Sequence, residues 1–542
     1  MTPTPQEKKT GAAPGLLKSA GVVSASIAIS RITGLLRESV LGGLFGAGSV
    51  FDAYVLGYRI PMLSRELFAD GALSHAFVPE FTKTQTTQGH EAARELSNIM
   101  GTMVLLIVGV FCLAGIFAAP LFVDIFAPGF QAIPGKRGLA INLVRVMFPF
   151  LLFVSLSAQV QGILNANHRF GIPAVSSAIF NLSSIATGLI LGHFTSLGTV
   201  YGMAAGVFLG GVVQLLFLLP GMWQLGYAWR PAWNLSHPGV KRILVLMGPA
   251  ILGNASSQIN SLVNTNFAAG LMDSSGHVMN GPVSWLSYAF RFLQLPMGVF
   301  AVAIASATLP RISRSAAAAN WPEFRESLSR SLVLICLLTI PSAAGLITLG
   351  GSMIGLVFEH GKFLPSDTHQ TALALSCYAL GLSGAATVKV MSPAFYALGD
   401  AKTPMLVSLS SVVVNAMIAW GLIHFAGMGH IALALSVAAV STFTSILLIL
   451  LIRPRIGGIR GGFLLDSFFR IALASTATGI TAWLIRLFSH SFLHGRTAYV
   501  VDLVLGVPAG VAVFYGLATV LHVPELAEAR AAILRKRKAK SA

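Results

Sequence analysis

Long apolar runs fill most of this chain and are separated by short polar segments. A run of about 20 mostly apolar residues is long enough to cross a bilayer as an α-helix. The pattern therefore predicts an all-α polytopic membrane protein with 14 transmembrane helices. They are expected near residues 17–43, 51–80, 96–126, 138–165, 172–193, 199–222, 241–270, 282–309, 327–358, 369–398, 403–426, 429–452, 463–488 and 498–521.

The composition agrees with a membrane protein. Of 542 residues, 55% are hydrophobic and only 10% are charged, whereas a soluble protein carries about 25% charged residues. The mean hydropathy is +0.76. These values exclude an ordinary soluble enzyme, a disordered chain and a fibrous repeat.

The basic residues predict an orientation. Lys and Arg number 36 against 19 Asp and Glu, a net charge of +17. With 14 spans and a cytoplasmic N-terminus, 22 of the 36 fall in cytoplasmic segments and four in outer loops, as the positive-inside rule expects. The outer four are Lys136, Arg137, Lys362 and Arg496. Both termini are therefore expected in the cytoplasm, and the excess charge needs no nucleic-acid partner.

An internal repeat divides the chain. The segment A-F-V-P-E-F-T-K at 76–83 resembles A-T-L-P-R-I-S-R at 307–314, and Pro173 matches Pro404 at the same offset of 231 residues. The repeat predicts two pseudo-symmetric six-helix lobes around a central cavity, related by an axis along the membrane normal. The expected domains are an N-terminal lobe (1–232), a C-terminal lobe (233–455), an extra helix pair (456–522) and a basic cytoplasmic tail (523–542).

The first two predicted spans carry an unusual number of charges. A charge at the centre of a bilayer costs about 2.5–3.5 kcal/mol on insertion scales, so such residues generally mark ion or substrate pathways. A closed ion-pair network is the alternative, because Asp52, Arg59 and Glu66 share one helix face at a spacing of seven. The charged residues are Arg31, Arg37, Glu38, Asp52, Arg59, Arg65, Glu66 and Asp70.

Two polar stripes mark the second lobe. Interhelical hydrogen bonding is one explanation for such stripes, but two of them in one lobe favour the wall of a polar cavity. They comprise Asn254, Ser257, Gln258, Ser261, Asn264 and Thr265, and then Ser284, Ser287, Tyr288, Arg291 and Gln294. Because Arg makes bidentate contacts with phosphate oxygens, Arg31, Arg37, Arg65 and Arg291 predict an anionic, phosphorylated substrate.

Signatures of enzymes are absent from the sequence. We find no H-E-x-x-H, G-x-S-x-G or Walker motif, and the three cysteines lie far apart in apolar stretches. A transporter without cofactor or metal is expected, and its coupling to an ion or to the membrane potential is left open by the sequence.

Several segments resemble one family. S-R-I-T-G-L-L-R-E (30–38), R-I-P-M-L-S-R-E-L-F-A-D-G-A (59–72), S-W-L-S-Y-A-F-R-F-L-Q-L-P (284–296) and K-V-M-S-P-A-F-Y-A-L-G-D-A-K-T-P (389–404) look like the MurJ (MviN) family of lipid II flippases. The resemblance implies the multidrug/oligosaccharidyl-lipid/polysaccharide exporter fold, with a V-shaped cavity and a lateral groove for a polyprenyl tail along the last two helices.

The resemblance also implies roles for individual residues. The family's substrate-binding residues match Arg31, Arg37, Asp52, Arg65 and Arg291, and Asp70 matches an acidic position proposed to help in gating. From the charge cluster and the polar stripes, supporting or gating roles are also expected for Glu38, Arg59, Glu66, Asn254, Ser257, Ser261, Ser287 and Gln294. Phe290 and Gln294 stand where many relatives have acids, and the seventh span lacks the acid that some members use to bind sodium.

The function expected from the resemblance is the movement of lipid II, an undecaprenyl-diphosphate-linked disaccharide peptide, across the bacterial inner membrane. Expected partners are lipid II and membrane lipids, with cell-wall synthesis enzymes as further candidates. The alternatives are an exporter of another polyprenyl-linked oligosaccharide or of drugs, a membrane-embedded glycosyltransferase and a non-transporting scaffold. Short outer loops with few acids argue against the glycosyltransferase.

Overall fold

A computed structural model describes residues 14–65, 74–196, 198–523 and 526. It divides into two compact units. The first unit contains residues 1–40, 56–123 and 137–254, and the second contains 41–55, 124–136 and 255–542. The division therefore falls within helix α10, and two short segments from the first 136 residues belong to the second unit.

Helices make up nearly all of the described chain. In chain order the first are α1 (Pro14–Phe45), α2 (Ser49–Arg65), α3 (Ser74–Gln88), α4 (His90–Phe117), α5 (Ala119–Phe126), η2 (Pro128–Ala132), α6 (Lys136–Met147), α7 (Phe150–Ala166), α8 (Gly171–Phe194) and α9 (Thr199–Trp223). They are followed by α10 (Pro238–Ala269), α11 (Pro282–Pro296), η3 (Met297–Ala301), α12 (Val302–Ala317), α13 (Trp321–Phe358), α14 (Pro365–Leu380), α15 (Leu382–Ala397), α16 (Lys402–His424), α17 (His430–Ile452), η4 (Arg453–Arg455), α18 (Gly461–Phe492) and α19 (Arg496–Val520).

The helices confirm an integral membrane protein. Within the described residues, ten helical segments are long and apolar enough to cross a membrane, or 11 if the bent pair α14 and α15 is one span. In all 14 predicted spans the residues that the structure describes are wholly or mainly helical. The count of 14 and the arrangement in two pseudo-symmetric lobes remain predictions.

Several predicted spans are interrupted. The predicted span 138–165 is divided into α6 and α7 just before Phe150, where Pro149 cannot donate a backbone hydrogen bond. A π-helical turn, η3, follows Pro296 inside the predicted span 282–309. The axes of α14 and α15 differ by 44° at Gly381. A Cβ at Gly381 would lie 2.4 Å from the Ala438 Cα, so the bend lies where α15 meets α17 closely.

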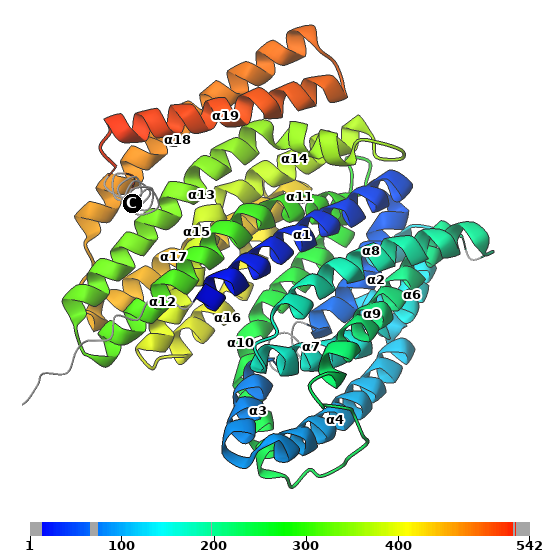
Figure 1. Ribbon diagram of the computed structural model, residues 1–542. Helices are drawn as coiled ribbons and strands as arrows, with labels where there is room; N and C mark the ends of the chain where they lie inside the picture. The colour runs from blue at the N-terminus through cyan, green and yellow to red at the C-terminus, as the bar shows by residue number, and fades with distance from the viewer. Residues whose placement is uncertain (1–13, 66–73, 197, 524–525, 527–542) are drawn as a thin grey trace, which may run out of the picture. The chain divides into compact units, whose positions relative to one another are not determined.

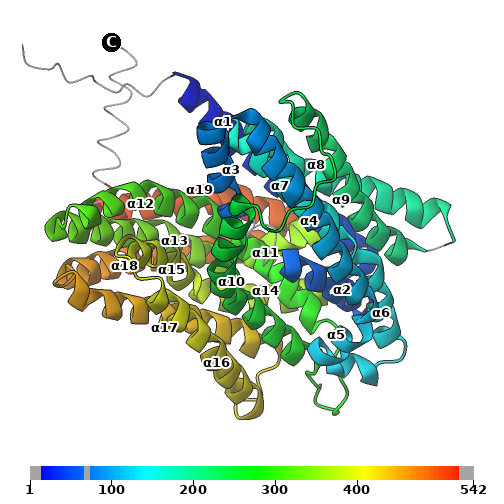
Figure 2. The ribbon, with the colours of Figure 1, turned by 90° about the horizontal axis from the view of Figure 1, so that it is seen from below.

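The first unit contains a closely packed helix pair, α8 and α9, which run side by side (Figure 2). Glycines allow this approach. A Cβ at Gly206 would lie 2.4 Å from the Ser184 carbonyl oxygen, and one at Gly202 would lie 2.4 Å from the Gly192 nitrogen. Small residues at helix contacts are typical of membrane proteins, where close packing rather than water exclusion holds helices together. Beside this pair, α3, α4 and α7 enclose an apolar core around Phe77, Phe81 and Met100.

The second unit is built around the long helix α13. One core, around Phe324, Met391 and Phe395, lies between α13, α15 and α17. The final pair, α18 and α19, packs together and against α13 (Figure 1). A small apolar cluster including Val333, Ile471 and Ala518 joins the pair to α13, and the assignment of the pair as a separate domain remains a prediction.

Candidate functional site

A buried carboxylate lies in the first turn of α2. Asp52 is 1% exposed. It accepts a hydrogen bond from Lys136 Nζ at 2.8 Å, from the backbone amides of Gly281 and Ser284 at 2.9 Å each, and from the Ser284 hydroxyl. Because Gly281 and Ser284 lie at the start of α11, the carboxylate also meets the positive end of that helix's dipole.

The cation of this centre is as buried as the anion. Lys136, the first residue of α6, is 2% exposed. Its Nζ also donates to Asn280 Oδ1 at 3.0 Å and lies 4.2 Å from the centre of the Phe130 ring. A desolvated ion pair is tolerated when its remaining hydrogen bonds are satisfied, as they are here. We call Asp52, Lys136, Asn280 and Ser284 the Asp52 centre.

The Asp52 centre argues against the alternative of a closed ion-pair network along α2. In that alternative Asp52 pairs with Arg59, but its partners are Lys136 and the start of α11. Lys136 was expected in an outer loop, as a topology signal only. Sequence spacing gave no indication of the pair, since 84 residues separate the two side chains.

Arg37 in α1 is held in a defined position within the first unit. Its side chain is buried, and Nη2 lies 3.2 Å from Glu38 Oε1. The guanidinium carbon lies 5.0 Å from the ring centre of Tyr58 and 5.4 Å from that of Phe180, distances typical of cation–π contacts. An Arg fixed by a carboxylate and two rings keeps its charge and has a restricted orientation.

The other predicted cations are more accessible. Arg31 is exposed on α1, while Arg59 and Arg65 on α2 are half-buried. Arg65 Nη1 lies 3.5 Å from the Met62 sulfur. Glu66 and Asp70 lie outside the described residues. Arg291 is half-buried on α11 in the second unit, so the four arginines are divided between the units and their common cavity remains a prediction.

The two polar stripes are partly used within the protein. In α10, Asn264 accepts a bond of 2.9 Å from Asn415 of α16, and the Thr265 hydroxyl donates to the Ser261 carbonyl. In α11, Ser284 binds Asp52. The contacts of Asn264 and Ser284 join different helices and so match the interhelical alternative to a cavity wall, whereas the Thr265 bond lies within α10.

The remaining members differ in accessibility: Gln258 and Tyr288 are buried, and others are at least partly accessible. Ser257 is exposed, and Ser287 and Gln294 are half-buried. The side chain of Asn254 lies outside the described residues. These positions stay candidates for a cavity wall.

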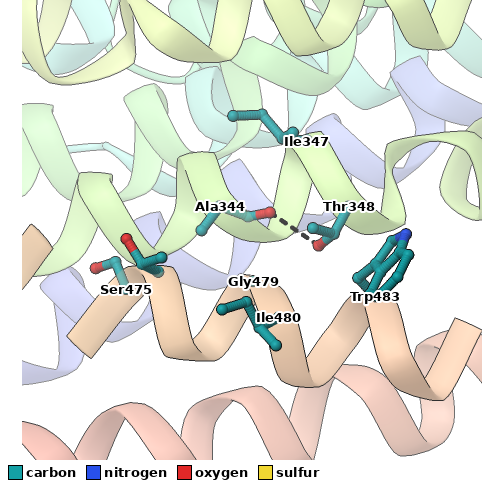
Figure 3. Close-up of a pocket in the computed structure, with 8 residues that line it drawn as sticks. Ala344, Ile347, Thr348, Ser475, Gly479, Ile480 and Trp483 are labelled. Carbon is teal, nitrogen blue, oxygen red and sulfur yellow. Dashed lines mark hydrogen bonds between the residues drawn. The ribbon is translucent and has the colours of Figure 1, made fainter. Parts of the chain in front are cut away.

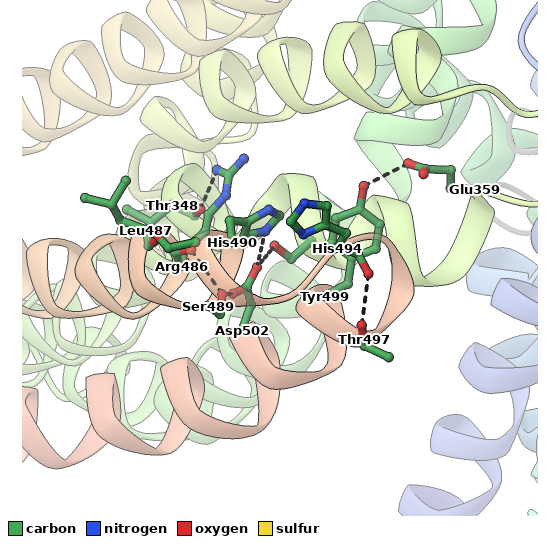
Figure 4. A network of polar contacts seen from close by, with 12 residues as sticks. Thr348, Glu359, Arg486, Leu487, Ser489, His490, His494, Thr497, Tyr499 and Asp502 are labelled. Atoms are coloured by element: carbon green, nitrogen blue, oxygen red, sulfur yellow. Dashed lines mark hydrogen bonds and ion pairs between the residues drawn. The ribbon is translucent and has the colours of Figure 1, made fainter.

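A second buried carboxylate lies in α19 and escaped the sequence analysis. Asp502 is fully buried and accepts hydrogen bonds from Ser352 of α13, Ser489 of α18 and His490 Nε2, the last at 3.0 Å (Figure 4). We call these four residues the Asp502 centre. Serines and histidines scattered over 150 residues form no recognisable motif, so only the packing of α13, α18 and α19 brings them together.

An apolar groove runs along the contact of α13 and α18. Its volume is about 330 Å³, and Figure 3 shows its lining from both helices. The lining residues are Ala344, Ile347, Thr348, Ser475, Thr476, Gly479, Ile480 and Trp483. The only polar side chains among them are small hydroxyls, so the groove is suited to a hydrocarbon chain.

An accessible ion pair joins two loops of the second unit. Asp400 accepts hydrogen bonds from the Arg455 guanidinium and from the Lys402 and Thr403 amides. Hydrogen bonds from Thr403, followed by the interaction with Arg455, lower the pKa of Asp400 to about 2. Among the residues that the structure describes, no group of three or more His, Cys, Asp or Glu side chains is arranged to hold a metal ion.

Comparisons with known proteins extend over most of the chain. The family described as "Lipid II flippase MurJ" matches residues 41–501. A "Lipid II flippase MurJ" of Burkholderia cenocepacia is 33% identical over 444 residues, covering 81% of this chain and 84% of the relative. A "Probable lipid II flippase MurJ" of Vibrio cholerae is 36% identical over 437 residues, covering 78% of this chain and 81% of the relative.

A solved structure has the same fold. It is titled "Lipid II flippase MurJ, inward closed conformation" and superimposes with a TM-score of 0.76 at 24% identity, covering 92% of this chain and 98% of that one.

Proposed function

We propose that this chain, which belongs to the lipid II flippase MurJ family, moves lipid II from the inner to the outer leaflet of the bacterial inner membrane by alternating access. The family match over residues 41–501 carries the proposal. Members of such a family move a lipid without changing it covalently. We place both termini in the cytoplasm, on the 22 to 4 distribution of basic residues, with cell-wall synthesis enzymes as neighbours.

The physical task concerns the head group alone. A diphosphate carries charge that cannot enter about 30 Å of hydrocarbon unless other groups replace its water. The polyprenyl tail already favours the bilayer by about 0.8 kcal/mol for each buried CH₂. The protein therefore has to provide a polar, cationic path for the head group, while the tail stays in lipid.

We assign the diphosphate to Arg31, Arg37, Arg65 and Arg291. Arg37 supports the assignment most directly, because a buried guanidinium held by Glu38, Tyr58 and Phe180 is an oriented phosphate donor. Arg31 is exposed and needs no rearrangement to reach a ligand. Ser257, Ser261, Ser287 and Gln294 would contact the sugars, since hydroxyl and amide groups suit uncharged polar ligands.

The Asp52 centre is proposed as the closure at the outward end of the path. It joins the starts of α2 and α6 to the start of α11, which are outward ends if both termini are cytoplasmic. Opening toward water would rehydrate both Asp52 and Lys136, so the broken ion pair is compensated by solvent. Opening toward lipid would leave the charges of Asp52 and Lys136 unpaired and without water. The closure is thus suited to a path that opens into an aqueous phase.

The apolar groove between α13 and α18 is proposed to hold part of the polyprenyl tail. Its lining residues and its volume of about 330 Å³ suit a segment of hydrocarbon. A groove that opens to the membrane allows the tail to remain in lipid while the head group crosses.

The membrane potential is proposed to reset the empty carrier. A potential of 100 mV is worth about 2.3 kcal/mol for each charge that crosses the membrane. An inside-negative potential would draw the cationic, unloaded site back toward the cytoplasm. Unchanged turnover after collapse of the potential in proteoliposomes would contradict this part of the proposal.

The test replaces the native flippase of a depleted bacterial strain with this chain. The fraction of lipid II accessible to an impermeant enzyme at the outer face is then measured. We expect this chain to restore accessibility, and Arg31→Ala and Arg291→Ala each to abolish most of it at equal membrane levels. Arg330→Ala on α13, where a partly exposed Arg lies 2.8 Å from Glu326, is the matched control and should behave as wild type. Full transport by both cavity variants would refute the site.

A further inference from the structure

Two consecutive residues of α8 contact α1, and both contacts lie within the first unit. Phe180 lies against the Arg37 guanidinium, whose carbon is 5.4 Å from the centre of the ring. The next residue, Asn181, donates from Nδ2 to the Ser30 carbonyl and to the Thr33 hydroxyl, at 3.3 Å each. Helix α8 therefore binds α1 along two turns, from Ser30 to Arg37.

The Asn181 side chain forms a small polar network in this contact. Asn181 and Thr33 are both buried, so water does not compete for their hydrogen bonds. The Thr33 hydroxyl also donates to the Ser30 carbonyl at 3.0 Å. Apolar side chains could fill the same contact without desolvating an amide. The amide adds direction, because a hydrogen bond fixes the rotation of α1 against α8 more strictly than apolar packing does.

The rotation of α1 decides where its two arginines lie. Arg31 and Arg37 are six residues apart, which places them about 120° apart around a helix with about 100° per residue. Arg31 is exposed, whereas Arg37 is buried beside the rings of Tyr58 and Phe180. If α1 turned about its axis, Arg37 would leave both rings and Arg31 would change direction. The contact that opposes such a turn is the one made by Asn181.

We propose that Asn181 is a positioning residue for substrate binding. Its hydrogen bonds hold α1 in the rotation at which Arg31 and Arg37 meet the diphosphate of the lipid. Asn181 acts through α1 in this role and does not contact the substrate. The inference rests on the proposed function, which assigns the diphosphate to these arginines. Cations that are already oriented bind an anion more tightly, because less order has to be imposed at the moment of binding.

The test measures the dissociation constant of labelled lipid II on purified full-length protein in detergent, and thermal unfolding reports whether each variant is folded. Asn181→Leu is similar in size but has no donor. It is expected to raise the dissociation constant about three- to tenfold, as the loss of two neutral hydrogen bonds predicts. Asn181→Gln keeps the amide and should recover part of the affinity. Ser183→Ala is the matched control and should bind as wild type, since the Ser183 hydroxyl donates to the Ile179 carbonyl of its own helix.

A double-variant cycle separates positioning from a general effect on stability. If Asn181 acts through the arginines, Asn181→Leu should change the dissociation constant less in an Arg37→Ala background than in the wild type. A merely structural Asn181 would lower the unfolding temperature and leave the dissociation constant of the folded protein unchanged. That result, or an equal fold-change in both backgrounds, would overturn the proposal.

Failure of this inference and failure of the proposed function give different results. If Arg37→Ala weakens lipid II binding and Asn181→Leu does not, the positioning role fails while the cavity assignment stands. If the wild type does not bind lipid II, or Arg37→Ala binds it equally well, the cavity assignment fails and the role of Asn181 fails with it. Translocation in the depleted strain is measured separately.

Discussion

Asp52 and Asp502 are both buried carboxylates in helices of a membrane protein, yet their surroundings differ. Asp52 is bound by a fully buried Lys and by the start of another helix, contributed by segments about 80 to 230 residues away. Asp502 is bound by two serines and by His490, whose side chain is 36% exposed. One carboxylate has a permanent, desolvated countercharge, and the other has mainly neutral donors.

The difference indicates different roles. Breaking the Asp52 centre separates two full charges, so it can exist in two states only if water reaches it in the second one. Breaking the Asp502 centre removes hydrogen bonds that hold α18 and α19 to α13. We therefore propose that the contacts of Asp52 break and re-form during transport. The contacts of Asp502 stay in place and stabilise the fold.

The largest expected effect is that of Lys136→Met. Removing one partner of a buried ion pair leaves an uncompensated charge, which costs about 3–5 kcal/mol. We expect a large loss of thermal stability in detergent and loss of lipid II translocation. Lys362→Met, at an exposed lysine of the same unit, should leave both unchanged.

Combining Lys136→Met with Asp52→Asn separates stability from transport. The double variant has no buried charge and should regain much of the stability. It should not regain wild-type translocation if the ion pair also controls closure. A stable double variant with full activity would show that the Asp52 centre is only structural.

Asp502→Asn should have an intermediate effect. The amide keeps one acceptor oxygen but loses the charge that strengthens three hydrogen bonds, so a loss of about 1–3 kcal/mol is expected. Thermal unfolding measures this loss, and the fraction of outward lipid II measures activity. Translocation should persist at equal membrane levels. Its complete loss in a folded variant would contradict the structural assignment.

A matched serine pair sharpens the comparison. Ser284→Ala and Ser352→Ala each remove one hydroxyl donor to a buried carboxylate. Each should cost about 0.5–1.5 kcal/mol of stability. Only Ser284→Ala should change the rate of translocation, because only that hydroxyl binds Asp52, whose contacts break and re-form. Equal rates for the two variants would remove the distinction.

The accessible carboxylate Asp400 should give the smallest effect. Its pKa is lowered from 3.8 to about 2 by Thr403 and Arg455, so its contribution to stability is present at neutral pH and is lost as the pH falls from about 4 to about 2. At neutral pH, Asp400→Asn should cost at most about 1 kcal/mol, the value of an accessible ion pair. Thermal unfolding between pH 6 and 2 should show this difference shrinking; a constant difference would contradict it.

Hydrophobic patterning was sufficient to predict the helical membrane fold, and the motifs around Arg37 and Arg291 were sufficient to predict the family. The length and composition of an apolar segment are local properties of the chain, and so they can be recognised in a single sequence. The breaks near Pro149 and Gly381 were not expected, because apolar composition continues through them and helix geometry depends on packing.

The partners of buried charges could not be predicted in the same way. Asp52 was a candidate from its place in an apolar helix, but Lys136 resembled a topology signal at a loop. Asp502 lies in a predicted span that is otherwise apolar, so its neighbours in the sequence do not indicate a polar centre. Both centres exist only because tertiary packing brings together residues that are distant in sequence, and spacing carries no information about such pairs.

The most direct test of alternating access is to lock a helix contact within the second unit. The Asn266 side chain of α10 donates to the Ile125 carbonyl of α5 at 2.6 Å, so Ile125→Cys with Asn266→Cys places two thiols on contacting helices that a short bifunctional thiol reagent with a reducible bond can join. Cys112, Cys336 and Cys377 are first replaced by Ser. Outward lipid II accessibility is measured before crosslinking, after it and after reduction. Transport that stops when the pair is linked and returns on reduction agrees with the account; undiminished transport by fully linked protein would contradict it.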